Sequence, residues 1–243
     1  MLLAAITHCM VAQDLCGTMP HVHFIFAHRL QAQLQFQQGV PEFNKAMTDV
    51  FYHKGTNGLP LYRVPVVFHI VLKHPAAAQL TAQLDTLNNN FAGTKTAGRL
   101  AGWIQAIAGH SVIQFCLAAT DPMGQATTGI ERRTTQENSF TIDDRVKHTV
   151  SGGSPAWYTE RYFNIWVSDL SDNLPGYASF PDDGHPDEQG VVVDYRTLPG
   201  GSYTRYSSVN TLTHQTGHYS NLYHNYGDDP AGSGSDHSGG KVN

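Results

Sequence analysis

The sequence lacks several features that would assign it to other classes of protein. No apolar run approaches the roughly 18 residues that a membrane-spanning helix requires, and the hydrophobic fraction of 40% is ordinary for a globular chain. The formal net charge is -5 and the pI is about 6.2, so there is no excess of basic residues. A nucleic acid is therefore not expected as the main partner.

Cysteines and leader-like features are also sparse. The three cysteines, Cys9, Cys16 and Cys116, cannot all pair with one another, so at least one is free or has a partner outside the chain. The apolar residues 1–6 carry no basic region and no clear small-residue cleavage site. They are a weak candidate for a secretory signal.

Histidine is abundant, with 14 residues, and three of them stand in the stretch HQTGHYSNLYH at His214, His218 and His224. On a helix, His214 and His218 lie one turn apart on the same face, so both imidazoles can reach one ion. His224 can reach that ion only if the helix ends first, and Asn221 is typical of a helix end. Three neutral imidazoles with one open position describe a catalytic zinc site. The alternative is three histidines on a helix surface.

The rest of the chain predicts a mixed α/β domain in which strands and helices share one core. Runs rich in apolar and β-branched residues predict buried strands. Leu80, Leu84, Leu87 and Phe91 stand at helical spacing, which predicts a core-facing helix over 75–91. Weaker patterns predict helices over 24–38 and 43–52 and a domain boundary near 58–60. The predicted strands are 63–72, 112–119, 162–167, 176–180 and 190–195.

Taken together, these stretches resemble the pappalysin family of metzincin zinc endopeptidases. Residues 214–224 are similar to the motif H-E-x-x-H-x-x-G-x-x-H, with Gln215 at the position of its Glu and Asn221 at that of its Gly. The resemblance covers about residues 60–236 and implies an α+β catalytic domain, a twisted mixed sheet backed by helices. It also implies a secreted enzyme that acts on a peptide or protein substrate. The other matching stretches are VPVVFH at 64–69, LNNNF at 87–91, IQFCLA at 113–118, SGGS at 151–154, NIWV at 164–167, GYASFP at 176–181 and GVVVDY at 190–195.

The resemblance implies that His214, His218 and His224 bind zinc, which polarises the scissile carbonyl and lowers the pKa of a bound water. Gln215 occupies the position of the general-base glutamate, but an amide does not accept a proton. Loss of a general base lowers the rate by roughly 10²- to 10⁴-fold. We therefore expect a site that binds zinc and is largely inactive, whether Gln215 is natural or engineered.

A second motif, Cys16-Gly17-Thr18, precedes the predicted domain. A thiolate is a good fourth zinc ligand and would displace the catalytic water. The family often carries a similar Cys-Gly-Thr, so the resemblance implies a pro-segment over 1–58 with a cysteine switch at Cys16, followed by a catalytic domain over 59–243. The alternative is a buried cysteine, or one joined by a disulfide to Cys9 or Cys116.

Two expectations concern the C-terminal part of the chain. The carboxylates of Asp228, Asp229 and Asp236 lie in a Gly-rich stretch that suits calcium, and a solvated acidic loop is the alternative. Metzincins have a methionine in a turn below the zinc, downstream of the third histidine. The last methionine here is Met123, so the resemblance predicts an incomplete lower subdomain.

Two functions from different classes fit these patterns. The first is a zinc endopeptidase whose edge strand near 176–180 binds an extended peptide by adding a strand to the sheet. The second is a non-catalytic, zinc-dependent binding module that keeps the cleft and has lost hydrolysis. A third reading is a fragment that does not fold stably. The residue at position 215 in the native gene distinguishes the first two, because Glu there supports the enzyme and Gln supports the binding module.

Overall fold

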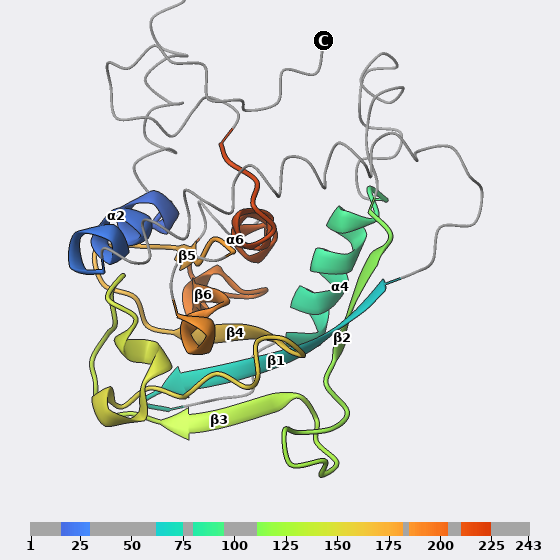
Figure 1. Cartoon of the computed structure of the whole chain (residues 1–243), viewed down its shortest axis with the longest axis horizontal. Coiled ribbons are helices and arrows are strands. Elements are labelled where there is room, and N and C mark those ends of the chain that lie inside the picture. Colours follow the sequence, from blue (N-terminus) through green and yellow to red (C-terminus); the bar gives the residue numbers. More distant parts are fainter. Residues whose placement is uncertain are drawn as a thin grey trace, which may run out of the picture.

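A six-stranded mixed sheet forms the centre of the molecule in the computed structural model, which describes residues 16–29, 62–74, 80–94, 111–181, 185–203 and 210–224 (Figure 1). The strands are β1 (Tyr62–Leu72), β2 (Ile113–Leu117), β3 (Ile130–Thr134), β4 (Phe163–Ser168), β5 (Gly176–Ala178) and β6 (Val191–Asp194). The described α-helices are α2 (Thr18–His28), α4 (Leu80–Phe91) and α6 (Thr211–Tyr219). Short 3-10 turns are η1 (Arg145–Lys147), η2 (Thr149–Ser151), η3 (Pro186–Glu188) and η4 (Tyr195–Thr197).

The strand order is β2-β1-β4-β6-β5, and β1 is long enough to serve two partners on one edge. Its first half pairs in parallel with β2, Tyr62 opposite Ile113, and its second half pairs in parallel with β3, Phe68 opposite Ile130. β4 and β6 continue the parallel sheet, whereas β5 pairs antiparallel with β6. The short strand β5 is therefore the sheet edge opposite β2 and β3, and it lies between α2 and α6 in Figure 1.

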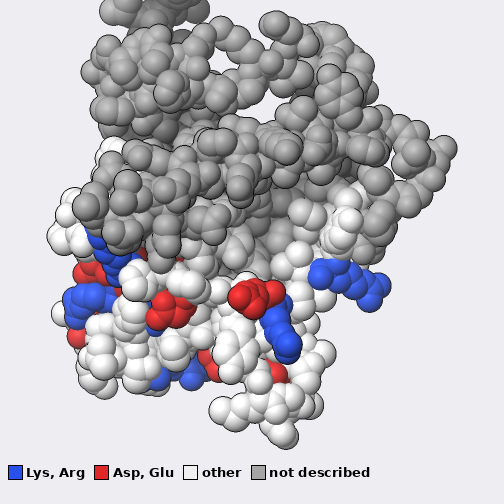
Figure 2. Space-filling view, in the orientation of Figure 1, with Lys and Arg blue, Asp and Glu red and all other residues white. Residues whose placement is uncertain are grey.

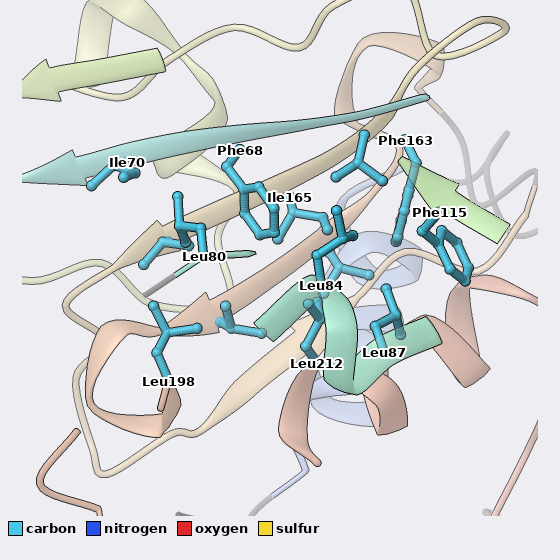
Figure 3. Close-up of a cluster of buried hydrophobic side chains, with 14 of the residues drawn as sticks. Phe68, Ile70, Leu80, Leu84, Leu87, Phe115, Phe163, Ile165, Leu198 and Leu212 are labelled. Carbon is cyan, nitrogen blue, oxygen red and sulfur yellow. The ribbon is translucent and has the colours of Figure 1, made fainter. Parts of the chain in front are cut away.

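One face of the sheet packs against α4 and α6. Leucines at positions 80, 84 and 87 repeat at helical spacing, so all three point from α4 into the core. Phe68 and Ile165 meet them from β1 and β4, as Figure 3 shows, and both are fully buried. Leu212 ties α6 to the same cluster, so the helix that carries the histidine motif is held by the main hydrophobic core.

The opposite face is covered mainly by loops and 3-10 turns, and His21 of α2 packs against Tyr177 there. Trp166 of β4 is fully buried there, and its indole Nε1–H donates to the carbonyl of Ser154 over 2.7 Å. His69 of β1 stacks on Trp166 at a centroid distance of 5.1 Å. Its Nδ1 lies 2.8 Å from the Glu131 carboxylate and its Nε2 lies 2.9 Å from Asn164 Oδ1. This polar cluster joins β1, β3 and β4 across the sheet.

The predicted core elements are confirmed with small changes of bounds. The five predicted strands correspond to β1, β2, β4, β5 and β6, and the predicted leucine-rich helix corresponds to α4. β3 was not predicted. The helix predicted over 24–38 is wrong in its start, because α2 begins at Thr18, and it ends at His28 since Arg29 leaves helical geometry. The helix predicted over 43–52 and the boundary near 58–60 lie outside the described residues.

The surface shown in Figure 2 carries basic and acidic side chains side by side, without a patch of one sign among its described residues. In the part of the chain that the structure describes, no helix has both the length and the apolar character needed to cross a membrane.

Candidate metal centre

Helix α6 carries two of the three predicted metal-binding histidines on one face. His214 and His218 lie one turn apart, and their Nε2 atoms are separated by 3.1 Å. His218 is buried and His214 is exposed. Because Leu212 anchors the start of this helix in the core, the backbone positions of His214 and His218 are fixed relative to the sheet.

The chain reverses directly after α6 at Asn221, whose φ of 64° lies in the left-handed region. The Leu222 N–H donates to the Gly217 carbonyl over 3.0 Å, and the Asn221 N–H donates to the His218 carbonyl over 2.8 Å. These two bonds form a Schellman motif, in which asparagine is the usual substitute for glycine. The turn brings His224 Nε2 to 3.1 Å from His218 Nε2 and 3.2 Å from His214 Nε2. The helix end predicted near Asn221 is confirmed.

Hydrogen bonding indicates which nitrogen of His218 is available. Its Nδ1 lies 2.7 Å from the Leu222 carbonyl, which only accepts, so Nδ1 carries the proton and donates. In the neutral imidazole, Nε2 then presents a lone pair to the other two histidines. A backbone carbonyl bonded to the remote ring nitrogen is the arrangement that orients histidines toward metals. Three Nε2 atoms at 3.1–3.2 Å from one another cannot satisfy each other as donors and acceptors, but they can share a cation.

Cys16 completes the cluster from the other end of the sequence. Its Sγ lies 3.3 Å from His214 Nε2 and 3.5 Å from His218 Nε2. Burial raises the pKa of this thiol, but hydrogen bonds with the imidazoles of His214, His218 and His224 outweigh burial and lower the pKa from 9.0 to about 3. The side chain is therefore a thiolate near neutral pH. Both Cys16 and Cys116 are free, so the predicted alternative of a disulfide at Cys16 is not found.

The spacing of these donors fits zinc. A tetrahedron with bonds of about 2.0–2.1 Å to nitrogen has edges of about 3.3 Å, and a nitrogen–sulfur edge is about 3.5 Å for a bond of about 2.3 Å to sulfur. The observed nitrogen–nitrogen and nitrogen–sulfur separations are 3.1–3.2 Å and 3.3–3.5 Å. All four donor atoms lie within 4.8 Å of one another. Three imidazoles and one thiolate form a donor set that zinc accepts and that magnesium and calcium do not favour.

The residues around Cys16 lie along the sheet edge. The three residues Cys16-Gly17-Thr18, which we call the capping segment, run beside β5. The Gly17 N–H donates to the Gly176 carbonyl over 3.0 Å, and the Ala178 N–H donates to Thr18 Oγ1 over 3.2 Å. These are outward groups of β5, because Tyr177 is the residue that faces Val192 of β6 between them. The capping segment thus occupies the edge that was predicted to bind a peptide.

Gln215 faces this segment from α6 and is buried, with 1% of its surface exposed. Its Oε1 accepts a hydrogen bond of 2.6 Å from Thr18 Oγ1. Its Nε2 donates to the Gly176 carbonyl over 3.1 Å and approaches Cys16 Sγ at 3.6 Å. The amide therefore joins the helix, the sheet edge and the capping segment.

Helix α2 follows the capping segment and is held by charged side chains. His21 Nε2 lies 2.7 Å from Asp144 Oδ2, and Lys147 Nζ lies 2.7 Å from Asp144 Oδ1, all three side chains being buried. Burial raises the pKa of Asp144, but the charges of Lys147 and His21 outweigh burial and hold this pKa well below its usual range. At the end of the helix, Arg29 pairs with the Glu188 carboxylate. None of these partners was predicted from the sequence.

Comparisons with known proteins agree on one family. Residues 144–241 match the family model Peptidase_M43, described as pregnancy-associated plasma protein-A. An extracellular metalloprotease of Neurospora crassa is 30% identical over 182 residues, which cover 70% of this chain and 53% of that protein. The structure of mature mirolysin of Tannerella forsythia in complex with a cleaved peptide is 34% identical, with a TM-score of 0.67, over 71% of this chain and 67% of that one. The chain belongs to the pappalysin family.

A second solved structure matches a larger share of the present pappalysin. A promirolysin mutant of Tannerella forsythia is 29% identical with a TM-score of 0.74, and the match covers 88% of this chain and 71% of that one. The chain spans about half the length of the curated relatives it matches, 53% for the Neurospora crassa protein. The α+β architecture predicted from the sequence is confirmed by these structures.

The structure brings four of the predicted site residues of this pappalysin together. His214, His218, His224 and Cys16 converge, and Gln215 lies beside them. The predicted calcium ligands Asp228, Asp229 and Asp236 lie outside the described residues, as does Cys9. Sequence reasoning missed Thr18 and His21. Thr18 could have been found from its place in the Cys-Gly-Thr motif, whereas His21 carries no local signal.

Proposed function

We propose that this chain is the peptidase domain of a zinc-dependent endopeptidase, held latent by Cys16 and lacking a general base because of Gln215. The observation that carries the proposal is the convergence of three imidazole nitrogens and one thiolate within 4.8 Å. Bound zinc would polarise a carbonyl group and lower the pKa of a coordinated water. His214, His218 and His224 would hold the ion, and Cys16 would take the fourth position.

The substrate in this proposal is an extended peptide bound along β5. The outward carbonyl of Gly176 and the outward N–H of Ala178 already engage protein groups of the capping segment. A peptide strand would use the same groups once that segment is displaced, because main-chain pairing at a sheet edge is independent of side-chain identity. The mirolysin structure with a cleaved peptide supports a peptide ligand for this fold.

Latency in this proposal resides in the N-terminal region, residues 1–58, as a pro-segment. The thiolate would exclude water from the fourth position on the metal, and the capping segment would exclude a peptide from β5. The wider match to promirolysin, 88% of this chain against 71% for mature mirolysin, supports the assignment. Relatives described as extracellular metalloproteases support an extracellular location. Calcium binding by Asp228, Asp229 and Asp236 stays a prediction.

A second function, a zinc-dependent peptide-binding module without hydrolysis, is favoured by Gln215. Its amide does not take a proton from water, and both ends of the amide are already engaged in hydrogen bonds. On this reading, the chain would bind peptides along β5 and release them intact.

The two functions are separated by restoring the base and removing the cap. The full chain, Gln215→Glu, Cys16→Ala and the double variant Gln215→Glu/Cys16→Ala would be assayed with fluorogenic casein, with zinc content measured for each. The endopeptidase predicts roughly 10²- to 10⁴-fold more cleavage by the double variant than by Cys16→Ala alone.

The matched control is Gln215→Glu/Cys116→Ala, which removes the other described free thiol and keeps the cap. It should cleave no faster than Gln215→Glu alone. A double variant that binds one zinc per chain and still cleaves nothing would refute the endopeptidase and leave the binding module.

A further inference from the structure

The Gln215 amide makes contacts that a glutamate at the same position could not make. Its Oε1 accepts from Thr18 Oγ1, while its Nε2 faces two acceptors, the Gly176 carbonyl at 3.1 Å and Cys16 Sγ at 3.6 Å. The residue therefore serves as acceptor at one end and donor at the other. Among side chains of this length, only an amide does both without a change in protonation.

The partners determine which way the amide points. Thr18 Oγ1 accepts from the Ala178 N–H, so its own proton is free to go to Gln215. The Gly176 carbonyl only accepts, and it also receives the Gly17 N–H. Rotating the amide by 180° would bring two carbonyl oxygens together at the Gly176 side, which is repulsive. The donor end of Gln215 must face β5 and the thiolate.

A carboxylate at position 215 would reverse this balance. One of its oxygens would take the place of Nε2 and face the Gly176 carbonyl and the Cys16 thiolate without a proton to share. Both contacts would change from attraction to repulsion inside a buried site, where such contacts are poorly screened. The usual glutamate of the motif would thus loosen the capping segment, whereas Gln215 holds it.

Close approach of the backbones depends on two glycines. A Cβ on Gly17 would lie 2.6 Å from Leu174 Cδ1 and 3.0 Å from the Gly176 oxygen. A Cβ on Gly176 would lie 2.6 Å from the Val192 oxygen and 3.4 Å from Gln215 Cγ. The capping segment is therefore closely fitted to β5, and β5 to β6, with the Gln215 side chain in van der Waals contact with Gly176. Thr18 and Cys16 are 0% and 8% exposed, so the contact excludes solvent.

We propose that Gln215 is a latch residue, which fixes the capping segment across the metal site and makes Cys16 a resident fourth ligand instead of a releasable one. The inference rests on the proposed function, because it assumes that the site holds zinc. It adds that the Gln215 form is a closed His₃Cys centre that joins α2 to the sheet edge. Structural zinc sites have four protein ligands in this way, whereas catalytic sites keep one position open.

The latch is tested by the reactivity of Cys16 in the zinc-loaded full chain. Parent and Gln215→Glu proteins would be treated with iodoacetamide, and labelling of each cysteine would be followed by peptide mass spectrometry. We expect Cys16 in Gln215→Glu to be labelled at least about tenfold faster, because two donated hydrogen bonds are lost. Cys116 is an internal reference whose rate should not change, since it lies against the Val64 carbonyl, away from the site.

Two further variants complete the test. Thr18→Val removes the hydroxyl that bridges Gln215 and Ala178 and should also accelerate labelling of Cys16. This variant serves if Gln215→Glu does not fold. Thr216→Val is the matched control, because Thr216 is equally buried but its hydroxyl bonds to the Leu212 carbonyl within α6, and it should leave the rate unchanged.

The outcomes separate the latch from the proposed function. A parent chain that binds zinc, together with unchanged Cys16 labelling in Gln215→Glu and Thr18→Val, would overturn the latch alone. A parent chain that binds no zinc would overturn both the proposed function and the latch.

Discussion

Replacing Asp144 with asparagine should destabilise the protein more than any exposed substitution. The Asp144 carboxylate is buried and lies 2.7 Å from both Lys147 Nζ and His21 Nε2. Asparagine keeps the size of the side chain and tolerates the left-handed backbone at this position, where φ is 61°. What is lost is the negative charge, which leaves the Lys147 ammonium buried with only neutral partners, the Glu188 carbonyl at 2.7 Å and Ser179 Oγ at 3.4 Å.

Removing one partner of a buried ion pair costs about 3–5 kcal/mol. For a chain of this size, each kcal/mol lowers Tm by about 2–4 °C, so the expected decrease is about 6–20 °C. Urea unfolding of the zinc-free protein would give the free energy of unfolding, with tryptophan fluorescence, to which Trp166 contributes, as the signal. That indole lies 5.3 Å from Lys147 Nζ and reports on this region.

A double-mutant cycle tests whether the loss of stability comes from the Asp144–Lys147 ion pair. Asp144→Asn/Lys147→Met removes both charges and should recover at least about 2 kcal/mol of the single loss, because no unpaired charge stays buried. Asp143→Asn, at the exposed neighbouring contact with the Arg145 N–H, should change stability by no more than about 0.5 kcal/mol. A single variant within about 1 kcal/mol of the parent would refute the argument that Asp144 compensates Lys147.

Three further predictions follow from the same structure. Folding lowers the pKa values of Asp144 and Glu188 from 3.8 and 4.5, so the stability that these carboxylates contribute is complete above about pH 4.5 and is lost as the pH falls toward the lowered values. The urea concentration at the unfolding midpoint should therefore decrease with acidification. Asp144→Asn should make that decrease smaller. Asn221→Gly should keep the zinc affinity of the parent. Asn221→Val should lower the free energy of unfolding by about 1–2 kcal/mol, because valine is strained at the left-handed turn, and should weaken zinc binding by about tenfold in a competition titration. Equal zinc affinities of the two variants would contradict the role of the turn. Zinc at about 100 times its Kd should stabilise the parent by about 2.7 kcal/mol in thermal melts, an effect that a chelator reverses and that His218→Ala abolishes.

The sequence alone predicted those helices and strands whose buried residues form a regular apolar pattern. Strands β1, β4 and β6 are continuous apolar runs because they are covered on both faces, and their positions were predicted closely. The spacing of Leu80, Leu84 and Leu87 predicted α4 for the same reason. The three histidines were singled out because metal binding demands a spacing that packing does not, and the structure brings their Nε2 atoms together.

The missed features depend on contacts between distant parts of the chain. β3 reads Ile-Glu-Arg-Arg-Thr, a polar stretch without the alternation typical of strands, and only its parallel pairing with the end of β1 makes it one. His21 meets Asp144 across 123 positions, and Thr18 meets Gln215 across 197. No local pattern marks such pairs. From the sequence alone, Gln215 was interpreted as the loss of a general base. Its role in holding the capping segment could be proposed only from its contacts in the structure.

The separation between Cys16 and His218, 202 positions along the chain, has a consequence for how the protein folds. Closing so long a loop carries a large entropic cost, which must be met before the contacts at its ends contribute. The thiol is synthesised well before its histidine partners and must stay reduced until the helix that carries two of them has docked. The metal centre is therefore expected to form late in folding, and zinc supplied too early would meet a chain that offers only part of its ligands.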